Sequence, residues 1–256
     1  MIHPQAIVHP SARIAEDVEI GPWTIIGENV EIGKGSKVAS HVVLQGPTKI
    51  GQYNKIFQFA SIGEVPQDKK YGGEVTRLEI GDHNTFREYC TINRGTEQGG
   101  RLTKIGHHNL FMSYTHVAHD CAIGDHAIFS NNASIAGHVT VGDYAILGGF
   151  VGVHQFCTLG AYSFSAAGSI ITKDVLPYVK VSGYPAKVHG LNTIGLERLG
   201  YSSKTLSALR QAYKIIFRQS HTVLEAIEQL LCMSGSDPEV LLFVAFLQQA
   251  ARGIVR

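Results

Sequence analysis

The 256-residue sequence has little charge and few of the residues that cross-link small proteins: it contains four cysteines and one tryptophan, and 17% of its residues are charged. The formal net charge of +1 excludes the strongly basic surface typical of nucleic-acid-binding proteins. No apolar run is long enough to span a bilayer. Met1 is followed directly by patterned sequence rather than by a secretory signal. We therefore expect a soluble, cytoplasmic protein without a transmembrane segment.

A six-residue repeat occupies most of the chain. An apolar, mostly aliphatic residue recurs at every sixth position from Ile2 to Ile171, with one lapse at Ser165 and two polar interruptions, which we expect to be loops at residues 68–79 and 98–104. A period of six is a multiple of the strand period of two and does not fit a helix of 3.6 residues per turn. Three short strands can close one triangular coil, and stacked coils bury the recurring side chains. The repeat predicts a parallel β-helix.

The cysteines fit this repeat better than they fit a disulfide or a metal site. Cys90, Cys121 and Cys157 occupy the small, inward-facing position four residues after the apolar residue. Cys121 and Cys157 are two coils apart, which is about 9–10 Å at the usual strand spacing and too far for a disulfide. We predict that all three are free and buried. Cys232 lies in a helical segment and carries no motif.

The C-terminal quarter changes to helical periodicity. Three helices are predicted, which start after an N-cap at Ser202 or Ser203, at a capping box in Thr222–Glu225, and at Asp237 with proline at the first helical position. The sequence therefore divides into a β-helix over 1–190 and a small α-helical domain over 191–256, which we expect to cap the open end of the β-helix.

Thirteen histidines are the one unusual count, and the repeat gathers some of them. Counting hexads by threes stacks His119, Gly137 and Gln155 in successive coils, with His138 and His154 beside them. Both polar loops leave from the end of the same side of the triangle. The first loop should therefore bring Asp68 and Lys70 to the histidine edge, which is where we place the functional site.

The residues at this edge are suited to acyl transfer to a hydroxyl group. The imidazole of His119 can take a proton from a hydroxyl and return it to a leaving thiol. The neighbouring Asp120 can fix the tautomer of that imidazole, and the backbone N–H of Gly137 can stabilise an oxyanion. No serine or cysteine of this column is an evident nucleophile, so we predict direct attack without a covalent acyl-enzyme.

Four segments resemble a known family. SIGEVPQDKKYGGE (61–74), HVAHDC (116–121), NNASIAGHVTVGDYAILGG (131–149) and VHQF (153–156) are similar to the UDP-N-acetylglucosamine O-acyltransferases, which begin lipid A synthesis in Gram-negative bacteria. The resemblance implies a left-handed β-helix, a homotrimer with sites between neighbouring subunits, and no metal or cofactor. It implies transfer of an (R)-3-hydroxyacyl chain from acyl carrier protein to the 3-hydroxyl of UDP-N-acetylglucosamine.

The resemblance also implies roles for individual residues. His119 becomes the general base, Asp120 its orienting partner and Gly137 the oxyanion donor. Ala167 occupies the position that limits the acyl chain. The residues implied to bind the UDP-sugar or the acyl group are Gln67, Asp68, Lys70, His116, His138, His154 and Gln155. Asn192 and Arg198 are implied to bind the nucleotide. The basic residues implied to meet the carrier protein, unless they form only a solvated helix face, are Lys204, Arg210, Lys214 and Arg218.

Three positions depart from the family pattern. Leu199 stands where many relatives carry a second basic residue, and Ile194 stands where they carry an acid, so nucleotide contacts should differ. Ala167 is often glycine in relatives that use longer chains, and its extra methyl group predicts a somewhat shorter preferred acyl chain.

Other functions fit the repeat less well. A zinc enzyme of the γ-carbonic anhydrase type needs three neutral imidazoles, for which His116, His119 and His154 are available, but Lys70 on the same edge would repel the cation. A non-catalytic scaffold leaves the histidine column unexplained. The sister N-acyltransferase of the same pathway carries an additional N-terminal uridine-binding domain, and here the repeats begin at Ile2.

Overall fold

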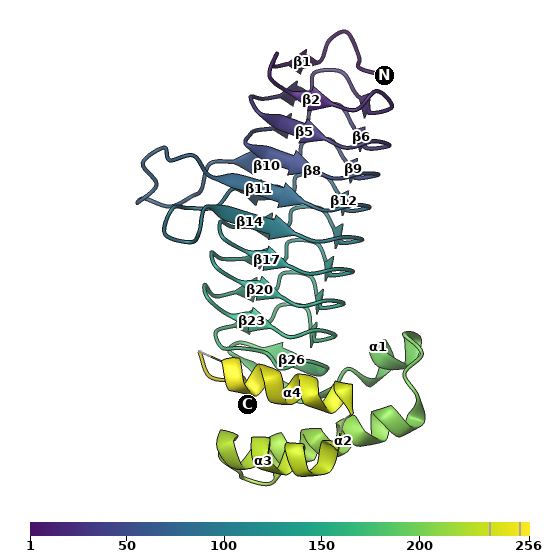
Figure 1. Cartoon of the computed structure of the whole chain (residues 1–256), viewed down its shortest axis with the longest axis vertical. Helices are drawn as coiled ribbons and strands as arrows, with labels where there is room; N and C mark the ends of the chain where they lie inside the picture. Colours follow the sequence, from purple (N-terminus) through teal and green to yellow (C-terminus); the bar gives the residue numbers. More distant parts are fainter. Residues whose placement is uncertain (236, 251) are drawn as a thin grey trace.

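The computed structural model describes residues 1–235, 237–250 and 252–256. The chain winds into a stack of triangular coils, and helices cover its C-terminal end (Figure 1). Each coil contributes one strand to each of three parallel sheets of nine, eight and ten strands, in which only the last pairing is antiparallel. The predicted left-handed parallel β-helix with a helical C-terminal part is confirmed.

Most strands are two or three residues long, because each side of the triangle takes only part of a hexad. The first sheet consists of β1 (Ile7–Val8), β4 (Ile25–Ile26), β7 (Val43–Leu44), β10 (Ser61–Glu64), β13 (Thr91–Asn93), β16 (His116–Val117), β19 (Ser134–Ile135), β22 (Gly152–Val153) and β25 (Ile170–Ile171). The second sheet consists of β2 (Arg13–Ile14), β5 (Val30–Ile32), β8 (Thr48–Ile50), β11 (Arg77–Ile80), β14 (Leu102–Ile105), β17 (Ala122–Ile123), β20 (Thr140–Val141) and β23 (Thr158–Leu159). The third sheet consists of β3 (Glu19–Ile20), β6 (Lys37–Val38), β9 (Lys55–Ile56), β12 (Thr85–Phe86), β15 (Leu110–Phe111), β18 (Ile128–Phe129), β21 (Ile146–Leu147), β24 (Phe164–Ser165), β26 (Val179–Gly183) and β27 (Ala186–Leu191).

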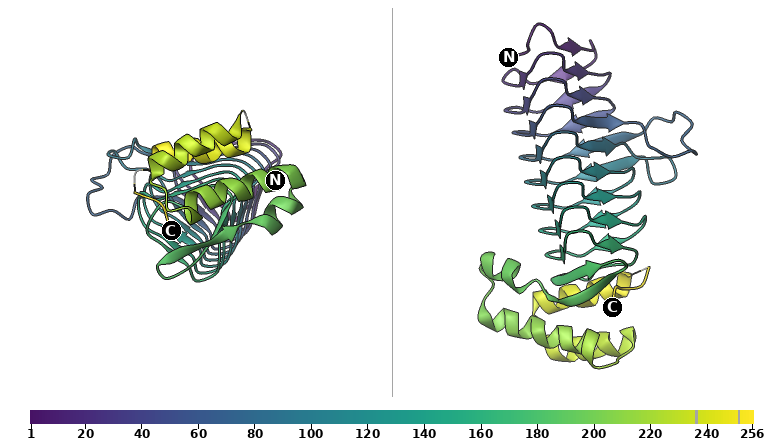
Figure 2. Two further views of the ribbon diagram at one scale, coloured as in Figure 1. Left: turned by 90° about the horizontal axis from the view of Figure 1, so that it is seen from below. Right: turned by 180° about the vertical axis from the view of Figure 1, so that it is seen from behind.

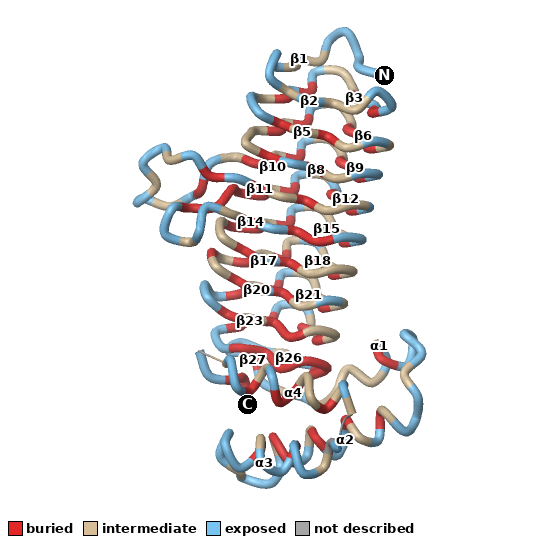
Figure 3. Tube along the Cα trace, in the orientation of Figure 1, coloured by how far each residue is buried: buried red, intermediate tan, exposed pale blue. Residues whose placement is uncertain are grey.

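The core is a column of side chains inside the triangle. Figure 3 marks the buried residues in red in successive coils of the stack. The hexad residues keep register from coil to coil: Val117 pairs with Ile135, and Ile135 pairs with Val153. These side chains are almost completely buried, as are Cys121 and Cys157 at the small inward position, so the prediction of free buried cysteines is confirmed. Burial raises the pKa of the Cys121 thiol to about 12. The hexads therefore build the core and leave the corners for other tasks.

A ladder of buried asparagines lines the corner between the second and third sheets. The backbone N–H of Asn84 donates to Oδ1 of Asn54 at 2.9 Å, and the N–H of Asn109 donates to Oδ1 of Asn84 at 2.9 Å. Nδ2 of Asn84 also donates to the carbonyl of Gly106 at 2.9 Å. The amide side chains thus provide partners for backbone groups that the tight turn leaves without strand pairing.

Both polar interruptions leave from the corner between the first and second sheets, which we call the first corner (Figure 1). Their bounds differ from our expectation: the first excursion covers 65–76 and the second 94–101, because β11 and β14 begin earlier than the hexads indicate. Leu78 and Thr103 are buried and pair with each other ahead of the hexad residues. Because both excursions leave from one corner, they project from the same edge of the prism.

The C-terminal helices are α1 (Thr193–Arg198), α2 (Ser203–Arg218), α3 (Val223–Ser234) and α4 (Pro238–Gln249). Ser202 caps α2, Thr222 and Glu225 form the capping box of α3, and Asp237 caps α4, which confirms the three predicted helix starts. The β26–β27 hairpin and α1 were not predicted. We keep the proposed division after residue 190, although β27 ends one residue later, because α1 begins at Thr193. In the described ranges, no helix is long and apolar enough to cross a membrane.

Candidate active site

A groove of about 580 Å³ lies on the outer face of the first sheet and reaches the first corner. Outward-facing positions of β16, β19, β22 and β25 form its floor. Eight of its lining residues are Gln67, His116, His119, Ser134, Gly137, Gly152, His154 and Gln155.

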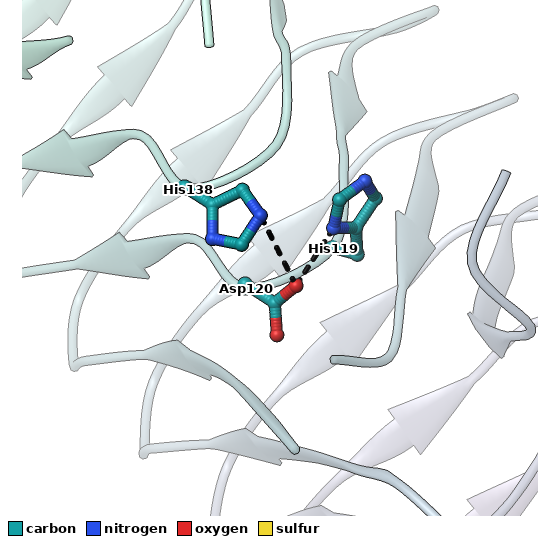
Figure 4. A group of neighbouring side chains, drawn as sticks. All are labelled: His119, Asp120 and His138. Carbon is teal, nitrogen blue, oxygen red and sulfur yellow. Dashed lines mark hydrogen bonds and ion pairs between the residues drawn. The ribbon is translucent and has the colours of Figure 1, made fainter. Parts of the chain in front are cut away.

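His119 and Asp120 form a hydrogen-bonded pair at the edge of this groove (Figure 4). The ring Nδ1–H of His119 donates to Oδ2 of Asp120 at 2.7 Å. The Asp120 side chain is 1% exposed and the His119 side chain 14% exposed, so the carboxylate is shielded while the ring keeps access to solvent. A carboxylate on Nδ1 fixes the proton there, so Nε2 is left as the acceptor. This arrangement is suited to a general base.

Gly137 lies in the next coil, directly over the ring of His119. The stacking follows from the ladder, in which the N–H of His138 donates to the carbonyl of His119 at 3.0 Å. A Cβ added to Gly137 would lie 2.5 Å from Cε1 and 2.8 Å from Nε2 of His119. Among the described residues, the N–H of Gly137 has no hydrogen-bond partner. The missing side chain therefore leaves both the imidazole and this N–H accessible at the groove.

His138 contacts the same carboxylate from the other side. Its Nε2 lies 3.7 Å from Oδ2 of Asp120, and its ring stands edge-on to that of His119 and stacks on Phe156 at 4.4 Å. Burial lowers the pKa of His138, although the charges of Asp120 and Asp68 act to raise it. We expected a substrate contact at His138, and within this chain its ring faces Asp120 and Phe156.

His116 lies on the floor of the groove. Its Nδ1 is hydrogen-bonded to Oγ1 of Thr91 at 2.7 Å in the neighbouring strand. Burial, followed by the charge of His119, lowers the pKa of His116. His116 is therefore neutral near pH 7.

His154 and Gln155 are exposed and lie on the C-terminal side of the groove. Nδ1 of His154 lies 3.1 Å from the carbonyl oxygen of Gln155. Gln155 is stacked over Gly137, since the N–H of the following residue, Phe156, donates to the Gly137 carbonyl. The predicted column of His119, Gly137 and Gln155 is confirmed.

The first excursion reaches the groove through Gln67. Gln67 lines the groove with His119, and the charge of Asp68 acts on His138. Lys70 is exposed, and its backbone N–H donates to Oδ1 of Asp68 at 2.9 Å. The expectation that this loop and the histidine column share one edge is therefore confirmed.

Three expected site residues do not lie near His119 within this chain. Ala167 is exposed in the turn between β24 and β25, at the opposite edge of the first sheet. Asn192 caps α1, and its Nδ2 donates to the carbonyl of Tyr162 at 3.0 Å. Arg198 ends α1, which lies across the prism from the first excursion (Figures 1 and 2). Within this chain, Asn192 and Arg198 are therefore not part of this groove.

A small pocket of about 290 Å³ lies on the helical part of the chain. Arg210, Lys214 and Arg218 line it together with Tyr213, so three of the four cations expected to meet a carrier protein gather in one place. Ile194 and Leu199, two of the three departures from the family pattern, are exposed, Ile194 on α1 and Leu199 at its C-terminal end.

Potential metal ligands group differently from His116, His119 and His154, the three imidazoles that the alternative zinc enzyme would need. Among the described residues, His119, Asp120 and His138 offer ligand atoms within 4.8 Å of one another. Both oxygens of Asp120 already accept hydrogen bonds, Oδ1 from the N–H of Thr96 and Oδ2 from the Thr96 hydroxyl and His119. These hydrogen bonds to the Asp120 carboxylate favour a role in proton transfer over a role in metal binding. Sequence reasoning missed Thr96, because no motif marks it and the hexad count placed it before the loop expected at 98–104, whereas β13 already ends at Asn93.

Family models match both parts of the chain. A model described as "Bacterial transferase hexapeptide (six repeats)" matches residues 1–34, 11–46 and 102–137. A second, "Udp N-acetylglucosamine O-acyltransferase; Domain 2", matches residues 174–255.

Full-length relatives agree with these matches. The acyl-[acyl-carrier-protein]–UDP-N-acetylglucosamine O-acyltransferase of Thiobacillus denitrificans is 56% identical over 255 residues, which cover 100% of this chain and 99% of the relative. Among solved structures, LpxA from Acinetobacter baumannii superposes with a TM-score of 0.98 at 54% identity, and UDP-N-acetylglucosamine O-acyltransferase from Moraxella catarrhalis does so with 0.98 at 48% identity. Each match covers 100% of this chain and 99% of the other. The chain therefore belongs to the UDP-N-acetylglucosamine O-acyltransferase family.

Proposed function

We propose that this chain transfers an (R)-3-hydroxyacyl group from acyl carrier protein to the 3-hydroxyl of UDP-N-acetylglucosamine. The observation that carries the proposal is the His119–Asp120 pair at the groove, with Gly137 open beside it. The names of the curated relatives, which are 50–56% identical over their full length, state an acyl carrier protein donor and a UDP-N-acetylglucosamine acceptor.

His119 acts as general base in this proposal. Its Nε2 takes the proton from the sugar hydroxyl as the oxygen attacks the thioester carbonyl, a role that typically contributes about 10²- to 10⁴-fold. Asp120 stabilises the imidazolium that forms, and the N–H of Gly137 donates to the oxyanion. The imidazolium then returns the proton to the departing thiolate. Cys121 faces the core and cannot act as a nucleophile at the groove. The acceptor hydroxyl therefore attacks the thioester directly.

The remaining site residues are assigned by position. Gln67, Asp68 and Lys70 bind the acceptor from the first excursion, with His116, His138, His154 and Gln155 along the groove. Asn192 and Arg198 bind the nucleotide from a neighbouring subunit of a homotrimer, which would explain why they lie across the prism from His119 in one chain. Ala167 limits the acyl chain. The cations of α2 meet the acidic carrier protein. A cytoplasmic location remains a prediction.

Assaying the purified protein with UDP-N-acetylglucosamine and a series of (R)-3-hydroxyacyl carrier-protein donors tests the proposal. His119→Ala should abolish turnover while circular dichroism and size-exclusion elution stay unchanged, because the His119 side chain lies at the corner rather than in the core. His9→Ala, in an exposed N-terminal turn, is the control and should keep full activity. Turnover of His119→Ala near that of the wild type would rule out the general-base assignment.

A further inference from the structure

The second excursion changes the first corner at the point where Asp120 lies. In the two following coils the corner residue has a left-handed backbone, and its N–H donates to a carbonyl of the previous coil: His138 to His119 at 3.0 Å and Phe156 to Gly137 at 3.1 Å. Asp120 has the same backbone conformation, with φ 59°. The second excursion opens the turn of the previous coil, so the N–H of Asp120 has no carbonyl of that turn to donate to. It donates instead to Oγ1 of the buried Thr103 at 2.8 Å.

The excursion also supplies two donors to the Asp120 carboxylate. The backbone N–H of Thr96 donates to Oδ1 at 2.7 Å, and the Thr96 hydroxyl donates to Oδ2 at 2.6 Å. The N–H of Gly99 donates to that same hydroxyl oxygen at 3.2 Å, which directs the hydroxyl hydrogen toward the carboxylate. Thr96 is only 3% exposed. Hydrogen bonds this short to a buried carboxylate are of the charge-assisted, strong type.

Gly99 brings the backbone of the excursion against the carboxylate itself. A Cβ at this position would overlap Cγ and both oxygens of Asp120. Residues 94–101 therefore cover Asp120 with main chain and fix the plane of its carboxyl group through Thr96. That plane determines the direction in which Oδ2 meets Nδ1 of His119.

We propose that Thr96 is a positioning residue for the transfer reaction. The second excursion is a clamp that holds the Asp120 carboxylate, and through it the Nδ1-protonated tautomer and the orientation of the His119 ring. Without the hydroxyl donor, one of the three hydrogen bonds that fix the carboxylate is lost, and the carboxyl group can rotate away from the ring. The effect on catalysis rests on the function proposed above, whereas the effect on the tautomer does not.

Steady-state kinetics of paired variants test the clamp. Thr96→Val removes the hydroxyl at nearly constant side-chain volume and keeps the backbone N–H donor. The variant should lower kcat about 10- to 100-fold, as expected for the loss of a hydrogen bond to a charged group. Its KM for UDP-N-acetylglucosamine should stay within about twofold of the wild-type value. Thr96→Ser should restore kcat to within about threefold. Thr24→Val is a matched control, since Thr24 is equally buried and its hydroxyl donates to the Ala39 carbonyl at 2.6 Å far from the groove; it should leave kcat unchanged.

Two further measurements separate positioning from a general loss of structure. In an Asp120→Asn background, Thr96→Val should lower kcat by less than about twofold, because it acts through the carboxylate. Nitrogen-15 NMR of the imidazoles, with His119 assigned from its missing signal in His119→Gln, should show a mixed tautomer in Thr96→Val and a single one in Thr96→Ser. An unchanged tautomer, or equal losses of kcat in the two Asp120 backgrounds, would overturn the proposal. If the wild type transfers no acyl group, the proposed function fails, and the tautomer measurement still tests the clamp.

Discussion

Replacing Gly137 with alanine should disable the site without disturbing the fold. The backbone φ of Gly137 is not in the left-handed region, so alanine is compatible with its conformation. Its Cβ, however, would lie 2.5 Å from Cε1 and 2.8 Å from Nε2 of His119. The neighbouring main chain is held by the ladder between coils, so the His119 ring has to move.

The size of that movement follows from the contact distance. Ordinary carbon–carbon contacts begin near 3.4 Å, so the ring has to shift by about 0.9 Å to accommodate the methyl group. A misplacement of about 1 Å typically costs about 10²-fold in rate, equivalent to about 2.7 kcal/mol of activation free energy. The shift also breaks the 2.7 Å bond to Asp120. We therefore expect kcat to fall at least about 100-fold.

The assay compares Gly137→Ala with Gly149→Ala. A Cβ at Gly149 meets only the Asn131 carbonyl oxygen at 3.4 Å, and its corner lies away from His119. Gly149→Ala should change the free energy of unfolding by less than about 0.5 kcal/mol. Gly137→Ala should keep the fold but lose about 1.5–3 kcal/mol with the bond to the charged carboxylate, and only Gly137→Ala should lose turnover. If Gly137→Ala keeps more than a tenth of the wild-type kcat, the close approach of Gly137 to the His119 imidazole does not matter for the reaction.

Two predictions concern stability, measured by chemical denaturation at a fixed protein concentration. Asn84→Ala removes the hydrogen-bond partners of the buried Asn109 N–H and of the Gly106 carbonyl and should lower the free energy of unfolding by about 2–4 kcal/mol. Replacing the exposed Asn131 with alanine should lower it by less than about 0.5 kcal/mol. Similar losses of stability in both variants would contradict the stabilising role of the asparagine ladder. Burial lowers the pKa values of His116 and His138, so the unfolded chain binds more protons below about pH 6.5, and stability should fall as the pH drops from 7.5 toward 5. His138→Gln should weaken that pH dependence. An unchanged slope of the free energy of unfolding against pH would refute the lowered pKa of His138.

The periodicity of the sequence was enough to predict the core and the stacking of the site. An apolar residue at every sixth position is compatible with short strands on a three-sided coil. Three hexads make a coil of eighteen residues, and this spacing aligned His119 with Gly137 and Gln155. This arithmetic holds because parallel pairing fixes the register: a slip of one residue would turn the side chains of a strand from the core to solvent.

Features that depend on contacts rather than on the six-residue repeat could not be predicted in the same way. The early starts of β11 and β14 rest on Leu78 and Thr103, which extend the alternation of strands rather than the six-residue repeat. Thr96 lies in an excursion whose fold is determined by contacts with Asp120 rather than by local pattern. The position of His138 against the carboxylate depends on the left-handed corner, which directs its ring between Asp120 and Phe156.

The two excursions show what this architecture allows in evolution. Ile62 pairs with Ile92 across the first excursion and Ile92 with Val117 across the second, in the same register as the uninterrupted coils farther along. An insertion at a corner therefore leaves the interior packing intact. New specificities can be acquired by exchanging or lengthening such segments, while mutations in the interior remain constrained by every neighbouring turn of the chain.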